Sequence, residues 1–293
     1  MFYRRKIILA LLQTFEGELN KISLQKLLFL TCKKLAYPAY DFIPYKFGCY
    51  SFSANADLTT MVKKGFLTED QASFKKVDKV NYLKKLEEKD QKIVAEIKNV
   101  YGRMSANALI KHTYINYPYW AINSEIANKH LNDIELERVK QNKTQSNNTV
   151  LFTIGYEGIS LEEYLNRLVK NDVRVLVDVR RNPLSQKFGF SKNQLTKYCG
   201  ALGIKYLHIP EVGIPSDLRQ ELNTQADYDN LFALYRKGLP ALTSYQQQIL
   251  SLLQKEQRIA LTCFEANTCQ CHRTHLAESI TKFPNFRYVL THI

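Results

Sequence analysis

Val173-Arg174-Val175-Leu176-Val177-Asp178-Val179-Arg180 is the stretch that decides the fold. Its run of aliphatic, mostly β-branched residues, ending in a carboxylate and a guanidinium, is typical of a buried strand. Four further stretches of this kind follow the chain through its second half, at Val150–Tyr156, Ile204–Ile209, Arg258–Phe264 and Phe286–His292. Segments of helical length separate them, and strands that alternate with helices predict β–α–β crossovers. We therefore expect an α/β domain with a mostly parallel sheet over residues 150–293.

The first half has a different pattern and is expected to be a mainly helical, winged-helix-like domain over residues 1–140. An aromatic hairpin is expected at Phe42–Phe52,. Helices are expected before and after it, at Tyr3–Phe15, at Leu24–Leu30 with Ser23 as its cap, at Asn55–Lys64 and at Lys84–Tyr101,. The polar segment 141–149 has no apolar periodicity, so we expect it to be a linker,.

The charge of the chain indicates an anionic partner. The formal net charge is +13, and residues 1–148 hold 24 Lys and Arg against 15 Asp and Glu. Basic charge attracts polyphosphates, so we expect nucleic acid as a partner, with DNA preferred over RNA. No apolar run is long enough for a membrane span, so no membrane partner is expected,. Gln13 interrupts the apolar start of the chain, which argues against a signal peptide and for a cytoplasmic protein with reduced cysteines,.

Polar residues collect where the predicted strands end. Ligands of parallel sheets bind beyond the carboxyl ends of the strands, so these residues are expected to share one site. The carboxylates Asp178 and Glu265 are the candidate general bases, although an ion pair between Asp178 and Arg180 or Arg181 is the alternative,. Cys263 or Cys271 is a candidate nucleophile, with His272 or Arg273 lowering the pKa of its thiol,.

A second group of residues is expected to bind the substrate. Arginines bind phosphate in a bidentate manner, and aromatic rings stack on bases, unless they belong to the core. The expected binding residues are Tyr156, Glu157, Arg180, Arg181, Ser185, Phe188, Tyr206, His208 and Arg273. Cys263, Cys269, Cys271, His272 and His275 offer a zinc site as an alternative,. Because the Cys-x-Cys-His run is tighter than the paired thiols of structural zinc sites, we expect no metal and no cofactor.

The second half closely resembles the family known as domain of unknown function 488. The matching motifs run in family order and include Thr153–Gly158, Val177–Arg180 with Pro183 and Ser185, Gly203–Tyr206, Cys263–Glu265 and Cys271–Arg273. The resemblance implies a Rossmann-like sheet and no settled reaction. Two features depart from the family: Val212-Gly213-Ile214 stands where it has leucine-glycine-glycine, and Cys269 is additional.

Residues 5–125 resemble the Panacea-type, antitoxin-associated domain. The resemblance rests on Ile22–Leu30, Pro44–Ser51, Asp57-Leu58 and Gly65–Leu67. It implies binding of a protein partner, and sometimes of DNA, in phage defence or toxin–antitoxin systems.

The leading hypothesis is an enzyme that processes nucleic acid or nucleotides. A hydrolase of the DNA glycosylase type, acting on modified or unmodified bases in antiviral defence, fits the basic charge, the aromatic residues and the carboxylates. Two alternatives are open. One is a DNA-binding regulator or antitoxin-type protein whose α/β domain senses a nucleotide, and the other is a thiol-dependent hydrolase or transferase.

Overall fold

The structure is a computed structural model that describes residues 1–215, 218 and 222–293. The chain divides into two compact units, Met1–Lys143 and Thr144–Ile293. Each unit has its own hydrophobic core and is described by itself. In the described part of the chain, no helix combines the length and the apolar character that crossing a membrane requires.

The N-terminal unit is mostly helical and is built around two helices that are apolar on nearly every side. Helices α1 (Tyr3–Thr14) and α2 (Lys21–Lys34) bury almost all of their central residues, as expected for helices without a polar stripe,. The remaining helices are α3 (Phe52–Lys63), α4 (Glu88–Tyr101), α5 (Ala106–Asn116) and α6 (Asp133–Gln141). The strands are β1 (Glu18–Asn20), β2 (Ile43–Tyr45), β3 (Gly48–Tyr50), β4 (Leu67–Glu69) and β5 (Ser73–Lys76).

Two local expectations in this unit were wrong. The cap of α2 is Asn20, whose side chain accepts from the amide of Ser23, so Ser23 lies in the first turn instead of capping the helix. The charged helix begins at Glu88, because Leu83–Lys85 forms a separate turn of 3₁₀ helix before it. The aromatic hairpin is present as the antiparallel pair β2–β3.

The C-terminal unit contains a sheet of five parallel strands, as the alternating pattern predicted. The strands are β6 (Val150–Gly155), β7 (Val175–Asp178), β8 (Lys205–His208), β9 (Arg258–Cys263) and β10 (Val289–His292). Their order across the sheet is β10-β6-β9-β7-β8, and each neighbouring pair is parallel. The ends of β6, β9 and β7 therefore lie next to one another in the centre of the sheet.

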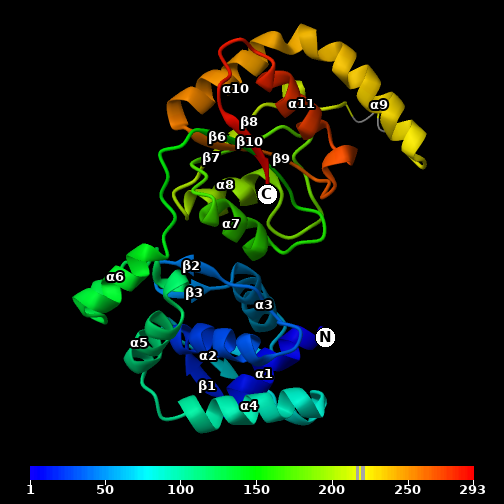
Figure 1. Ribbon diagram of the computed structural model, residues 1–293. Coiled ribbons are helices and arrows are strands. Elements are labelled where there is room, and N and C mark those ends of the chain that lie inside the picture. The colour runs from blue at the N-terminus through cyan, green and yellow to red at the C-terminus, as the bar shows by residue number, and fades with distance from the viewer. Residues whose placement is uncertain (216–217, 219–221) are drawn as a thin grey trace. The chain divides into compact units, whose positions relative to one another are not determined.

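Helices cover both faces of this sheet (Figure 1). The helices α7 (Leu161–Lys170) and α8 (Lys192–Gly200) lie on one face, and α9 (Gln225–Gly238), α10 (Thr243–Glu256) and α11 (His272–Thr281) lie on the other. Burial on both faces explains why β9 has no exposed residue and why its centre, Ile259–Leu261, is apolar,. This is the doubly covered, Rossmann-like architecture expected from the sequence.

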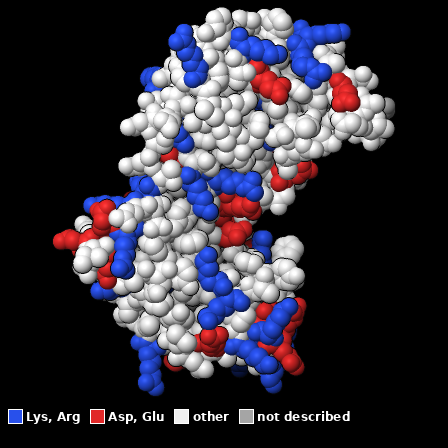
Figure 2. All heavy atoms as spheres, viewed as in Figure 1, with Lys and Arg blue, Asp and Glu red and all other residues white. Residues whose placement is uncertain are grey.

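The basic side chains do not form a single stripe on the face shown in Figure 2. Lys and Arg side chains are scattered over both units there and are interspersed with acidic ones. The net charge alone therefore does not locate a binding surface for an anionic partner, whereas a local cluster of cations would.

Candidate functional site

A cavity of about 450 Å³ lies beyond the ends of the central strands. Three cationic side chains, those of Arg180, Arg181 and Lys187, contribute to its lining, and no carboxylate stands among its described lining residues. The full described lining is Tyr156, Arg180, Arg181, Asn182, Leu184, Ser185, Gln186, Lys187, Ile214, Cys263 and Phe264. A cavity with this lining favours an anionic ligand, since guanidinium and ammonium groups bind phosphate or carboxylate oxygens.

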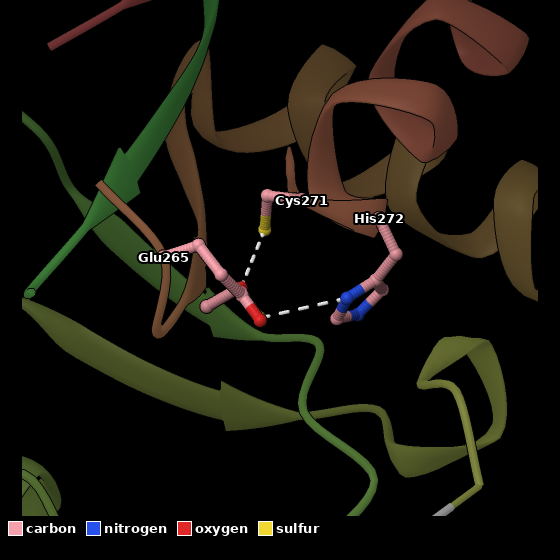
Figure 3. A group of neighbouring side chains, drawn as sticks. Glu265, Cys271 and His272 are labelled. Atoms are coloured by element: carbon pink, nitrogen blue, oxygen red, sulfur yellow. Dashed lines mark hydrogen bonds between the residues drawn. The ribbon is translucent and has the colours of Figure 1, made fainter. Parts of the chain in front are cut away.

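Cys263, which lines this cavity, belongs to a cluster of four side chains that also contains Glu265, Cys271 and His272. Glu265 Oε2 lies 3.0 Å from the sulfur of Cys263 and 3.0 Å from that of Cys271, and both thiols donate to it. The Cys263 sulfur also lies 3.5 Å from His272 Nδ1. Figure 3 shows Glu265, Cys271 and His272 pointing toward one another. One potential ligand atom from each of the four residues lies within 4.8 Å of the others, so the cluster has the dimensions of a metal site.

The two thiols of the cluster differ in their acidity. Burial alone would raise the pKa of Cys263, but the hydrogen bond with Cys271 and the neighbouring His272 outweigh it and hold this pKa well below its usual value. Burial and the proximity of Cys263 raise the pKa of Cys271 well above its usual value. Cys263 is therefore the thiol of the pair that carries negative charge first,.

Backbone contacts fix the loop that carries Glu265. The buried Arg273 donates from Nη1 to the carbonyl of Glu265 and from Nη2 to that of Ala266. Gly155 lies so close to this loop that an added Cβ would stand 1.9 Å from the carbonyl oxygen of Glu265. Glycine at the end of β6 thus allows the loop after β9 to approach, and Arg273 holds the loop and does not face the cavity as a phosphate ligand.

Asp178 is completely buried and paired with Arg180. The Arg180 Nε and Nη2 atoms lie 2.8 and 2.5 Å from the two carboxylate oxygens, and Tyr206 donates to Oδ2 at 2.6 Å. Burial alone would lower the pKa of Arg180, but the bonds to Asp178 outweigh it and raise this pKa, so the guanidinium stays charged. Asp178 lies outside the described lining of the cavity, whereas Arg180 belongs to it. The carboxylate therefore orients the arginine, which is the ion-pair alternative weighed above.

The aromatic residues expected to stack on a base are largely engaged within the protein. Tyr156 is buried and stacks on Phe190 with ring centroids 4.2 Å apart, while its hydroxyl accepts from Arg180 Nη1. The hydroxyl of Tyr206 is bound to Asp178. Phe188 is 37% exposed but lies outside the described cavity lining. Of the predicted rings, Tyr156 is thus the one that belongs to the described lining of the cavity.

The remaining predicted residues lie around the same rim. Ser185 lines the cavity, and its hydroxyl accepts from the amide of Lys187. Glu157 is exposed and accepts from the amide of Ala266. His208 Nε2 lies 2.9 Å from the carbonyl of Arg180, so it supports the loop after β7. These residues belong to one neighbourhood, but the cavity is lined by only part of the predicted set.

Lys187 is the charged residue of the described cavity lining that the sequence interpretation missed. Its ammonium donates to the carbonyl of Tyr156 at 2.7 Å, and partial burial lowers the pKa of this group. The sequence contained an indication of this role, because Lys187 lies between Ser185 and Phe188, which are both predicted to bind the substrate. Cys271 was weighed as a nucleophile, but its contact with Glu265 depends on the turn before α11, which the sequence does not specify.

Comparison with known proteins identifies the domain that carries this site. Residues 160–280 match the family model described as Domain of unknown function DUF488. The matched segment includes Asp178, Arg180, the loop after β7 and the whole cluster of Cys263, Glu265, Cys271 and His272. No curated protein matches the chain. The resemblance of residues 5–125 to the Panacea-type domain stays a prediction. The C-terminal half of the chain belongs to the DUF488 family.

Proposed function

We propose that the C-terminal unit is an enzyme that processes nucleic acid or a nucleotide in the cavity beyond β6, β9 and β7. The observation that carries the proposal is the cavity itself, where Arg180, Arg181 and Lys187 meet without an acidic neighbour among the described lining residues. Two guanidinium groups and an ammonium group suit the oxygens of a phosphate, and the reactive cluster begins at Cys263 in the same lining,.

The reaction proposed first is the hydrolysis of an N-glycosidic bond in DNA. Such a reaction needs a carboxylate that activates water or stabilises the positive charge developing on the sugar. Glu265 is the better placed of the two candidates, because it is half-buried and bound to Cys263, which borders the cavity. Asp178 is a positioning residue in this scheme, since its carboxylate is taken up by Arg180 and Tyr206. Action on DNA, and a defence role implied by the N-terminal resemblance, belong to this proposal.

The test is an assay for abasic sites. The full-length protein is incubated with single- and double-stranded DNA carrying modified or unmodified bases, and abasic sites are revealed by alkaline cleavage. We expect product with wild type and with Cys269→Ser, whose thiol is exposed outside the cluster, and at least a hundredfold less with Glu265→Gln,. DNA that binds with steep salt dependence but is never altered would instead indicate the regulator or antitoxin-type alternative.

A thiol-dependent hydrolase or transferase is the second candidate, and one observation favours it. Cys263 is the member of the cluster that lines the cavity, and a histidine nitrogen lies 3.5 Å from its sulfur. In this scheme the thiolate of Cys263 forms a bond to the substrate, the leaving group departs with a proton, and water or an acceptor later breaks the sulfur–substrate bond. Intact-mass measurement after rapid acid quenching should then find the chain with one substrate fragment added, and Cys263→Ser should abolish the adduct.

A further inference from the structure

We propose that Cys263, Glu265, Cys271 and His272 bind a zinc ion. Two thiols, one imidazole nitrogen and one carboxylate oxygen form a ligand set that zinc prefers, because thiolate and imidazole suit this borderline-soft ion. Hard divalent cations, such as magnesium, select oxygen ligands and are disfavoured by the two sulfurs.

The distances fit a tetrahedral zinc site. Zinc bonds of about 2.0–2.3 Å place tetrahedral ligand atoms about 3.3–3.8 Å apart. Glu265 Oε2 lies 3.0 Å from each sulfur, and the Cys263 sulfur lies 3.5 Å from His272 Nδ1. Since all four ligand atoms lie within 4.8 Å of one another, shifts of about 1 Å or less would complete the geometry,.

The orientation of His272 supports the same assignment. Its Nε2 lies 3.0 Å from the carbonyl oxygen of Val179, which only accepts, so Nε2 carries a proton and donates,. The other nitrogen, Nδ1, is the one that faces Cys263. Zinc-binding histidines use this arrangement, in which one nitrogen binds the ion and the other donates to a carbonyl that fixes the ring.

The surrounding charge gives an independent argument. Arg273 is 2% exposed; its Nη atoms donate to carbonyl oxygens and not to a carboxylate, and its Nε has no hydrogen-bond partner among the described residues. An isolated buried cation is costly. Two thiolates and a carboxylate around Zn²⁺ leave a net charge of about −1, with neutral histidine. Arg273 donates to the backbone of Glu265, so it lies where it would compensate this charge.

The proposed ion would also affect the chemistry at the cavity. Glu265 is the half-buried member of the set, whereas Cys263, Cys271 and His272 are buried, so the carboxylate is the ligand that exchanges most readily with water. If the proposed function holds, Glu265 would then be free to take a proton from the water that replaces it. Ligation would also withdraw Cys263 from the role of free nucleophile.

The experiment measures metal content, which does not depend on catalysis. The full-length protein is incubated with zinc sulfate, gel-filtered and analysed by plasma mass spectrometry. We expect about one zinc per chain in wild type and in Cys269→Ser, which removes an exposed thiol two residues from Cys271,. Cys271→Ser and His272→Asn should each weaken zinc binding at least tenfold in competition with a chromogenic chelator, and Glu265→Gln should weaken it less.

Cobalt in place of zinc provides an optical readout that can be measured on the wild type. The Co²⁺-loaded wild type should show thiolate-to-cobalt charge-transfer absorption, which Cys269→Ser keeps. Wild type without stoichiometric zinc after loading, or cobalt without thiolate absorption, would overturn the inference. Equal zinc affinity in Cys271→Ser and Cys269→Ser would do the same. Zinc at one per chain with no altered nucleic acid would instead contradict the proposed function and leave the metal site standing.

Discussion

The two units each bury an aspartate that holds an arginine beside a cavity, and the two cavities differ in charge. In the N-terminal unit Asp57 binds Arg4, Arg5 and Tyr40, and the adjoining cavity of about 330 Å³ combines Arg4 and Lys89 with Glu87 and Asp90. In the C-terminal unit Asp178 binds Arg180, and the cavity carries three cations and no described acid.

An aspartate–arginine pair does not by itself mark a binding site. Both pairs satisfy a buried carboxylate, which any fold requires once that residue is inside. The two cavities differ in the other residues that line them. Arg4 shares its cavity with Glu87 and Asp90, whereas Arg180, although paired with Asp178, shares its cavity with Arg181, Lys187 and a thiol. An anionic ligand is therefore expected in only one of the two cavities.

The largest effect should follow from removing the carboxylate of Asp178. Asp178→Ala leaves the buried Arg180 without its partner, which should lower the free energy of unfolding of the C-terminal unit by about 3–5 kcal/mol. Denaturant unfolding measures this loss, and calorimetry with a nucleoside monophosphate should show weakened binding. Asp57→Ala should also destabilise its unit, yet leave ligand affinity unchanged. Equal ligand affinity in Asp178→Ala and wild type would refute the positioning role of Asp178.

A smaller loss is expected when Gly155 is enlarged. Gly155→Ala forces the carbonyl of Glu265 away from the end of β6, which should cost about 1–3 kcal/mol of stability and disturb the cluster,. Gly200→Ala is the matched control, because nothing lies within 4 Å of an added Cβ at the end of α8. That substitution should be neutral or slightly stabilising. If both variants unfold at the same denaturant concentration, the close approach at Gly155 has no energetic role.

Removal of the exposed Arg181 tests whether the positive charge of the C-terminal cavity binds the ligand. Arg181→Ala should weaken binding of a nucleoside monophosphate about tenfold, because a hydrogen bond to a charged group contributes about 1.5–3 kcal/mol and solvent screens part of it. Stability should hardly change, since Arg181 is exposed. The controls are Arg287→Ala, which removes an exposed charge outside the cavity lining, and Arg4→Ala in the other unit. Titration calorimetry should give wild-type affinity for both controls.

The smallest expected effect is on the pH dependence of the stability of the N-terminal unit. Burial alone would raise the pKa of Asp57, but hydrogen bonds from Arg4, Arg5 and Tyr40 outweigh it and hold this pKa below its usual value of 3.8. A carboxyl whose folded pKa is depressed stabilises the fold above its unfolded pKa, and this stabilisation is lost as the pH falls through the folded pKa. The unit should therefore lose stability below about pH 4. Asp57→Asn should flatten that part of the profile, and an unchanged slope would contradict the assignment.

The sequence predicted the C-terminal sheet well because its strands are buried on both faces. Apolar runs such as 175–177 and 259–261, in strands that are buried throughout, leave little choice of structure,. The boundaries were harder. The cap of α2 shifted from Ser23 to Asn20, and α6 was not predicted at all, since a short helix with few buried residues has a weak pattern.

The site was predicted as a neighbourhood, while the role of each residue depended on side-chain direction. Asp178 and Arg180 are two residues apart, yet Asp178 is enclosed and Arg180 reaches the cavity, because the arginine is long and turns back onto the carboxylate. Tyr156 and Arg273 are polar residues at strand and helix ends that the fold uses internally. No periodicity encodes these choices, since loop conformation and packing decide them.

A crystal structure of the full chain with a bound DNA oligonucleotide tests the central claim most directly. The account predicts a phosphate within hydrogen-bonding distance of Arg181 and Lys187, with the sugar or base of the same nucleotide facing Cys263. DNA bound elsewhere on the chain, with the cavity filled by solvent alone, would contradict it.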